Sequence, residues 1–243
     1  MIAQLSDPHL RVGPDDQGSA AALTTAVAAV LELVPLPAAV LVTGDLAEHA
    51  SAAEYARVRE LLAPLPMPVH VLAGNHDDGD AMRQHFPLAG DGPYRYTTAC
   101  GGLRLVACDT SRRGRDDGDL DLDWLEAQLE TDAPTIVAMH HPPLLTGIGG
   151  LDAIGLPAAQ RTALAALLGR SPHVRRVVAG HVHRTAFAAL GGCGVVTCAS
   201  TNLQARLQIR EAGYELSDDP PAMLVHALLD GEPTSHVQPL RRG

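Results

Sequence analysis

Short apolar runs alternate with longer stretches of helical periodicity along the chain. The first six runs have four or five residues, are mostly apolar and are bounded by Gly, Pro or Asp. This pattern is typical of strands that are buried on both faces of a sheet. The predicted strands are Ile2–Leu5, Ala39–Val42, Val69–Leu72, Leu103–Ala107, Thr135–Met139, Arg176–Ala179, Gly194–Cys198 and Met223–Leu229.

The stretches between these runs carry recognisable helix ends. Ser51 and Glu54 predict a capping box, and Asp123 with Glu126 repeats the same spacing. Pro157 is expected at the first helical position of the last helix. The predicted helices are Ser19–Val34, Ser51–Ala63, Asp123–Glu130 and Pro157–Gly169.

Alternating strands and helices predict an α/β fold with right-handed crossover connections. The chain has no internal repeat, no low-complexity tract and no convincing linker, so we predict a single domain over residues 1–243. Glycine, proline and aspartate patches predict loops at Val12–Gly18, Gly90–Pro93, Gly114–Asp119 and Gly147–Gly155.

Composition and charge narrow the range of functions. A hydrophobic content of 46% with 19% charged residues is that of a globular protein, and the net charge of −10 disfavours nucleic-acid binding. No apolar run is long enough for a membrane span, and the start of the chain shows no secretory leader, so we expect a cytoplasmic protein. All 18 basic residues are Arg, which excludes a Schiff-base or P-loop lysine. The four cysteines are expected to be reduced core residues.

Polar residues of one chemical kind follow six of the predicted strands. The junctions read "SDPH", "TGDLAEH", "AGNHD", "CDTS", "HHPP" and "GHVH" in chain order. Ligands of open α/β sheets bind outside the carboxyl ends of the strands, so these junctions are expected to meet at one edge. The residues expected there are Asp7, His9, Asp45, Asn75, His76, His140, His181 and His183.

A simpler interpretation treats these residues as polar turns and buried histidines. It explains any one junction, but it does not explain why six of the twelve histidines fall at strand ends. Imidazole nitrogens with carboxylate and amide oxygens suit Mn, Fe, Co, Ni or Zn. Seven such side chains exceed the needs of one ion, whereas two ions about 3.5–4 Å apart that share a carboxylate would use them all. No Ser or Cys nucleophile has a triad context.

The motifs D-x-H, G-D, G-N-H-D, H and G-H-x-H occur in this order between Asp7 and His183. Together they resemble the calcineurin-like metallophosphoesterase superfamily. The segments "GNHDDGDAM", "CDTSRRGRDDGDLDLDWLEAQL" and "MHHPPLLTGIGGLDAIGL" are most similar to class III cyclic-nucleotide phosphodiesterases and bacterial glycerophosphodiesterases. The resemblance implies a four-layer α/β/β/α sandwich with mixed sheets and an active site at the carboxyl ends of the strands.

The resemblance also implies the roles of the site residues. One metal ion would be held by Asp7, His9, Asp45 and His183, and the second by Asp45, Asn75, His140 and His181, with Asp45 bridging. His76 matches the histidine that contacts the substrate phosphate and protonates the leaving alkoxide. The implied reaction is hydrolysis of a small phosphodiester, a cyclic nucleotide such as cAMP or a glycerophosphodiester, by a metal-bridging hydroxide.

Departures from related patterns leave some alternatives open. The chain lacks the Arg and the G-N-H-E of Ser/Thr phosphatases, and it has Glu48 where purple acid phosphatases have a metal-bound Tyr. A phosphomonoesterase on the same site and a non-catalytic scaffold of the same fold remain as alternatives. Homo-oligomerisation is also left open by the sequence.

Several residues near the motifs have less certain roles. His141 could exchange roles with His140 or orient a ligand, Asp77 is expected to support a ligand, and Asp109 either supports one or closes a turn. The loops at residues 144–156 and 201–221 are expected to wall the pocket, and about residues 199–243 to complete the sheet.

Overall fold

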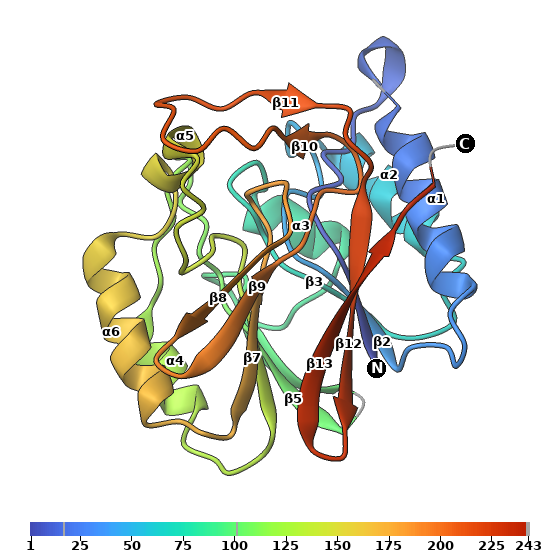
Figure 1. The fold of residues 1–243 in the computed structure, drawn as a ribbon. Coiled ribbons are helices and arrows are strands. Elements are labelled where there is room, and N and C mark those ends of the chain that lie inside the picture. The colour runs from blue at the N-terminus through green and yellow to red at the C-terminus, as the bar shows by residue number, and fades with distance from the viewer. Residues whose placement is uncertain (17, 101, 242–243) are drawn as a thin grey trace.

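The computed structural model describes residues 1–16, 18–100 and 102–241. Two sheets form its centre (Figure 1). The first has the order β13-β12-β1-β2-β3, and the second has the order β4-β5-β6-β7-β9-β8. Strands of the first sheet are β1 (Ile2–Leu5), β2 (Ala39–Val42), β3 (Val69–Val71), β12 (Ala222–Leu229) and β13 (Glu232–Pro239). Those of the second are β4 (Tyr96–Cys100), β5 (Leu103–Ala107), β6 (Thr135–Ala138), β7 (Val174–Ala179), β8 (Ala186–Leu190) and β9 (Cys193–Thr197).

Both sheets are mixed, as predicted. In the first sheet β1, β2 and β3 are parallel, and β12 joins β1 in antiparallel register with Ile2 opposite His226. In the second sheet β5, β6, β7 and β9 are parallel, while the outer strands β4 and β8 run antiparallel to their neighbours. The loops that follow the parallel strands of a sheet therefore begin at the same edge of that sheet.

Three apolar clusters stack the fold into four layers. One packs α1 (Ser19–Leu31), α2 (Ala52–Leu62) and α3 (Gly79–His85) on the first sheet, through side chains such as Leu23, Tyr55 and Met82. A second packs α4 (Leu122–Gln128) and α6 (Ala158–Gly169) on the other sheet. The third lies between the sheets and includes Leu41 and Leu105. This arrangement confirms the α/β/β/α sandwich (Figure 1).

The helix ends agree with the sequence in one case and differ in three. The capping box of Ser51 and Glu54 at α2 is confirmed. At α1 the cap is Gly18 and the helix ends at Leu31, before the predicted end. Helix α4 begins at Leu122, one residue earlier than predicted, and its cap is Asp121, whose carboxylate accepts from the amide of Trp124, so the Asp123 capping box was wrong. Helix α6 has Pro157 as its cap, not as its first helical residue.

Other elements lie outside the predicted set. The pair β10 (Gln204–Ala205) and β11 (Leu216–Ser217) forms a small ribbon, and α5 (Gly149–Ala153) lies in a predicted loop. Figure 1 shows the ribbon and α5 at the same end of the molecule. The four cysteines are buried and free. Across the described parts of the chain, no helix combines the length and the apolar character that a membrane span requires.

Candidate metal centre

The structure brings all seven predicted ligand residues together. They lie on five loops, each of which follows a parallel strand, and both sheets contribute. Asp45 is central, because its Oδ2 lies 3.3 Å from His9 Nε2 and 3.4 Å from His140 Nε2. The full set is Asp7 and His9 after β1, Asp45 after β2, Asn75 after β3, His140 after β6, and His181 and His183 after β7.

A glycine precedes three of these residues, and the packing explains why. A Cβ on Gly44 would lie 2.8 Å from Cγ of His140, and one on Gly74 would lie 2.8 Å from Cγ of Asp45. A Cβ on Gly180 would lie 2.6 Å from the Thr43 carbonyl oxygen and 2.9 Å from Asp7 Oδ2. The glycines of the motifs G-D, G-N-H and G-H-x-H are thus required because loops from different strands approach closely at these positions.

Five of the seven residues hold a left-handed backbone conformation. This conformation is uncommon outside glycine, although Asp and His adopt it more readily than most residues. Such strain concentrates at functional sites, where the surrounding structure enforces it. The φ angles are 50° at Asp7, 44° at His9, 49° at Asp45, 69° at His181 and 46° at His183.

In the first half of the cluster, acceptor atoms face one another. His9 Nδ1 donates to Glu48 Oε2 over 2.8 Å, and His183 Nδ1 donates to the Leu203 carbonyl oxygen over 2.8 Å. In the neutral form that a metal ligand must have, the Nε2 lone pairs of the two rings point inward, and these nitrogens lie only 2.9 Å apart. Carboxylate oxygens of Asp7 and Asp45 lie within 3.6 Å of these nitrogens. A cation among these four side chains would stabilise this arrangement.

The second half has the same character. His140 Nδ1 donates to the Thr43 carbonyl oxygen over 2.8 Å, and its Nε2 faces Asn75 Oδ1 at 3.1 Å, so in its neutral form the ring presents a lone pair there. His181 Nδ1 also lies 3.1 Å from Asn75 Oδ1, and its Nε2 is buried without a hydrogen-bond partner. Oxygen and nitrogen donors with no thiolate fit a divalent transition-metal ion.

The neighbouring carboxylates also determine the pKa values of the histidine rings in the cluster. Burial opposes a charge on His9, but Asp45, Glu48 and Asp7 outweigh it and raise the pKa of His9 to about 10. Burial likewise opposes the charge on His140, while Asp45 and Asp7 raise its pKa to about 9. Burial also opposes the charge on Asp45, yet the two neighbouring imidazoles hold its pKa well below the usual value. The centre therefore favours positive charge.

His76 lies beside the cluster but not in it. Its backbone amide donates to Asp45 Oδ1 over 2.9 Å, and its Nδ1 donates to the carbonyl oxygen of Glu48 over 3.0 Å. Its ring packs edge-on against His9, with the centroids 4.7 Å apart, and its side chain is 36% exposed. These contacts leave Nε2 as the ring nitrogen available to the cavity.

Asp77 connects the loop that follows β2 to the loop that follows β3 through hydrogen bonds. Its carboxylate accepts from the backbone amides of Leu46, Ala47 and Gly74 and from the hydroxyl of Tyr55. Burial, followed by the charge of Asp45, raises the pKa of Asp77 to about 6. It thus fixes the loop of Asp45 against the loop of Asn75, in keeping with the predicted supporting role.

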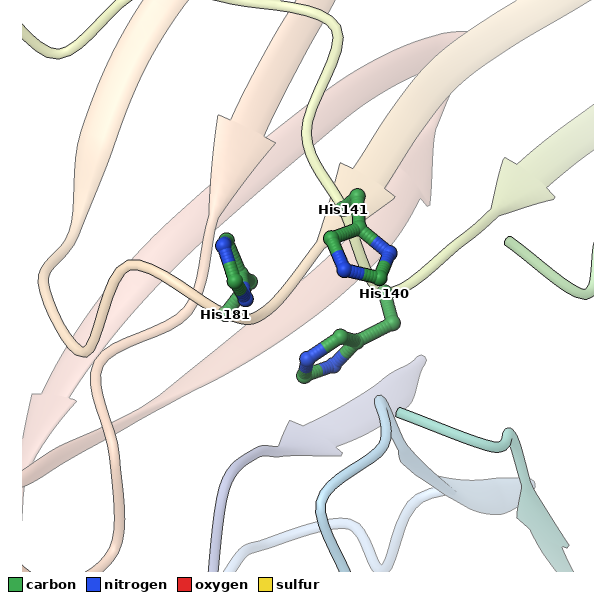
Figure 2. Close-up of side chains that lie close together, drawn as sticks. All are labelled: His140, His141 and His181. Carbon is green, nitrogen blue, oxygen red and sulfur yellow. The ribbon is translucent and has the colours of Figure 1, made fainter. Parts of the chain in front are cut away.

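His141 has partners on both ring nitrogens. Nδ1 accepts from the Thr110 hydroxyl over 2.9 Å, and Nε2 donates to the Asp116 carbonyl oxygen over 3.0 Å. Burial, followed by His140, lowers the pKa of His141 to about 3. Figure 2 shows it beside the rings of His140 and His181, with which it could form a three-nitrogen group. Its hydrogen bonds instead anchor the loop that contains Asp116.

Asp109 closes a turn. Its carboxylate accepts from the backbone amide of Tyr94 over 2.6 Å and from both the amide and the hydroxyl of Ser111. Arginines of the neighbouring acidic loop pair with Asp117, since both Arg112 and Arg115 lie within 2.7 Å of it.

Sequence reasoning missed the residues that orient the proposed ligands. Glu48 accepts from His9 and also from Arg11 Nη2 over 2.8 Å, which lowers the pKa of Glu48 to about 2 although burial opposes this. The carbonyl oxygens of Thr43 and Leu203 orient His140 and His183. Glu48 had a signal, because it lies three residues after Asp45 where a metal-bound Tyr occurs in another family. Backbone carbonyls leave no signal in a sequence.

A cavity of about 170 Å³ opens beside the cluster. From the loop at residues 201–221, which was expected to wall the pocket, Asn202 and Tyr214 line it. Gln204 is turned away and donates to the carbonyl oxygens of Ser200 and Asn202, and Arg206 pairs with Glu215. The cavity is lined by His9, Arg11, Ser19, Asp45, Glu48, Asn75, His76, Leu151, Ile154, His181, His183, Ser200, Asn202, Leu203, Ala205, Tyr214 and Leu216.

Three relatives resemble most of the chain. A probable cyclic nucleotide phosphodiesterase of Synechococcus sp. is 33% identical over 212 residues, 84% of this chain and 81% of the relative. The probable glycerophosphodiester phosphodiesterase GpdQ of Arcobacter nitrofigilis is 29% identical, covering 93% and 88%. The 3′,5′-cyclic adenosine monophosphate phosphodiesterase CpdA of Pseudomonas aeruginosa is 32% identical, covering 76% and 70%.

Structure and family comparison agree with the likeness seen in the motifs. The crystal structure of a dimetal phosphatase from Danio rerio matches with a TM-score of 0.74 and 17% identity, over 99% of this chain and 96% of that one, which shows a common fold. The profile of the calcineurin-like phosphoesterases matches residues 1–185, the part of the chain that carries all five motifs. Since the ligand-bearing loops fall within that match, the chain belongs to the calcineurin-like phosphoesterase family.

Proposed function

We propose that the protein is a binuclear-metal phosphodiesterase that hydrolyses a small diester, either a cyclic nucleotide or a glycerophosphodiester. The observation that carries the proposal is the convergence of seven oxygen and nitrogen donors from five loops, with Asp45 shared between the two halves. The names of the three relatives, all phosphodiesterases, support the same substrate class.

The proposed ligands divide as the two halves of the cluster do. Asp7, His9, Asp45 and His183 would hold one divalent ion, and Asp45, Asn75, His140 and His181 the other. Manganese, iron, zinc and cobalt all suit this donor set. When bound, such ions lower the pKa of coordinated water to about 7 and neutralise charge on the phosphate. The protein itself fixes the ring orientations, through Glu48, Thr43 and Leu203.

His76 is proposed as the general acid. With Nδ1 held by the Glu48 carbonyl oxygen, the protonated ring directs its Nε2–H toward the cavity. In the proposed hydrolysis a hydroxide oxygen forms a new bond to phosphorus while the ester P–O bond breaks. The His76 proton passes to the departing alkoxide, and the ring is left neutral. His76→Ala should therefore slow turnover by about 10²–10⁴-fold and leave metal content unchanged.

Two experiments test the proposal. Bis(p-nitrophenyl) phosphate and p-nitrophenyl phosphate should be compared with added manganese, and we expect a clear preference for the diester. A preference for the monoester would make the protein a phosphomonoesterase. Asp45→Asn should reduce the bound metal at both positions, measured by mass spectrometry, because it removes the shared charge. Loss of metal in His76→Ala would overturn the role given to His76.

We also propose that residues 1–243 act as one domain. The C-terminal part supports this, because β12 pairs with β1 in the first sheet and residues 200–216 contribute to the cavity lining.

A further inference from the structure

The cavity has two kinds of lining. The metal cluster and its neighbours supply a polar part, whereas α5 and the segment at residues 203–216 supply an apolar part. We call Leu151, Ile154, Tyr214 and Leu216 the apolar wall. Leu151 is 4% exposed, but Tyr214 and Leu216 are each 47% exposed, so large apolar surface remains open at this position. Exposed apolar side chains that gather at a cavity mark a binding surface.

Backbone hydrogen bonds fasten the two halves of this wall together. The amide of Gly149 donates to the Glu211 carbonyl oxygen over 3.0 Å, and that of Gly150 donates to Gly213 over 3.3 Å. A Cβ on Gly150 would lie 2.8 Å from the Gly213 carbonyl carbon and 2.9 Å from Tyr214 Cδ1, so only glycine permits this approach. Figure 1 shows the segment between β10 and β11 extending to α5.

The wall is also tied to the metal loop. The amide of Ala205 donates to the His183 carbonyl oxygen over 3.0 Å, and the ring of His183 donates to Leu203. Leu151 and Ala205 pack with Ile148 and with Val182, which lies between His181 and His183. The apolar wall therefore stands at a fixed position relative to the place where the phosphate would bind.

The size of the cavity limits what the wall can accept. At about 170 Å³ it is close to the 150 Å³ or so that holds one benzene ring in an apolar site. One ring-sized group therefore fits against the wall. A polyol such as glycerol would bury hydroxyl groups against carbon, which is unfavourable without hydrogen-bond partners.

Resting on the proposed phosphodiesterase function, we infer that Leu151, Ile154, Tyr214 and Leu216 select diesters in which one ester group carries an aromatic or heteroaromatic ring. An aryl or nucleoside ester is thereby favoured over a glycerol ester. Tyr214 supplies a ring face for stacking, and the aliphatic side chains surround the ring edge. The backbone hydrogen bonds from Gly149 and Gly150 to the segment at residues 211–213 keep Tyr214 at its position.

The selectivity is tested by the ratio of kcat/KM for 3′,5′-cyclic AMP to kcat/KM for glycerophosphoethanolamine, with manganese-loaded protein. Tyr214→Ala and Gly150→Ala should each lower this ratio by about 10–100-fold. Leu207→Ala is the matched control, since Leu207 is 55% exposed on the same segment and does not line the cavity. An unchanged ratio in Tyr214→Ala, or an equal loss in Leu207→Ala, would overturn the inference.

Ligand binding to metal-free protein separates this inference from the proposed function. Adenosine, which has no phosphate, should bind more tightly than glycerol in calorimetry, and Tyr214→Ala should weaken adenosine binding at least tenfold. If manganese-loaded protein hydrolyses no diester but adenosine binding depends on Tyr214, the proposed function is wrong and the inference that the apolar wall binds a ring is retained. If adenosine binds no better than glycerol, the wall is not a ring site.

Discussion

Gly74 gives the sharpest test of the proposed metal centre, because it packs against Asp45, the carboxylate proposed to be shared, without being a proposed ligand. In Gly74→Ala the new Cβ would lie 2.8 Å from Cγ of Asp45, whereas ordinary contact begins at 3.4 Å. Oδ1 and the backbone nitrogen of Asp45 would lie closer still, so Asp45 must withdraw by at least 0.6 Å, the difference between these two distances. Ligand distances at a metal site tolerate only about 0.2 Å. A shift three times as large should displace Asp45 from both ions.

The expected loss follows from comparable displacements. Disturbing the support of a metal ligand costs about 10–100-fold in affinity or activity, and a 1 Å misplacement costs about 10²-fold in rate. We expect Gly74→Ala to raise the manganese concentration for half-maximal activity by about 10–100-fold. The measurement is a manganese titration of bis(p-nitrophenyl) phosphate hydrolysis, with bound metal determined by mass spectrometry at each point.

Gly79→Ala is the matched control. Its Cβ would lie 3.5 Å from Tyr94 Cβ, an ordinary contact, at the first residue of α3 and in a backbone conformation open to alanine. It should keep the wild-type manganese requirement and gain roughly 0.4–1 kcal/mol in stability. Thermal unfolding followed by circular dichroism confirms that both variants are folded. A folded Gly74→Ala protein with the wild-type manganese requirement would refute the placement of Asp45 between two ions.

Three further predictions address support, acid stability and ion binding. Glu48→Gln should lower the affinity for one of the two manganese ions by about 10–100-fold in calorimetry, because His9 loses its carboxylate partner. An equal loss of affinity for both ions would contradict this. Burial, and then Arg176, lower the pKa of His226 to about 3, so the unfolded chain takes up a proton below pH 6.5 while the native protein does not. Lowering the pH from 7 to 5.5 should thus reduce the unfolding free energy by about 1.2 kcal/mol through His226 alone. Urea unfolding at the two pH values measures this, and the fall in unfolding free energy should be about 1.2 kcal/mol smaller in His226→Gln than in the wild type. Manganese at 100 times its dissociation constant should raise the unfolding free energy by about 2.7 kcal/mol, and EDTA should reverse this; an unchanged melting temperature would argue against binding to the native state.

The central strands could be read from sequence because burial on both faces leaves an uninterrupted apolar run. All eight predicted strands exist, with ends that differ by two residues at most. The missed strands are weaker signals. β8 is built from Ala186–Leu190, which is mostly alanine, and β13 begins Glu232-Pro233 and is largely polar. Both are edge strands, whose formation depends on a neighbour that the local sequence does not reveal.

The site divides in a similar way. Proposed ligands such as Asn75 and His140 could be found because they closely follow apolar runs. Their supporting contacts could not, because the Thr43 carbonyl oxygen meets His140 only when the two sheets pack face to face. Helix α5 was missed for a related reason: its glycines disfavour a helix locally, and it is held by hydrogen bonds to residues 211–213.

The left-handed backbone at five proposed ligands restricts how this centre can be rebuilt. At these positions a replacement must supply a donor atom and also tolerate the conformation, which leaves little beyond Asp, Asn and His. Asn75 and His140 have ordinary backbone angles and lie in the same half of the cluster. Directed exchange of the preferred ion should therefore begin at these two residues, where the backbone conformation does not restrict the replacement to Asp, Asn or His.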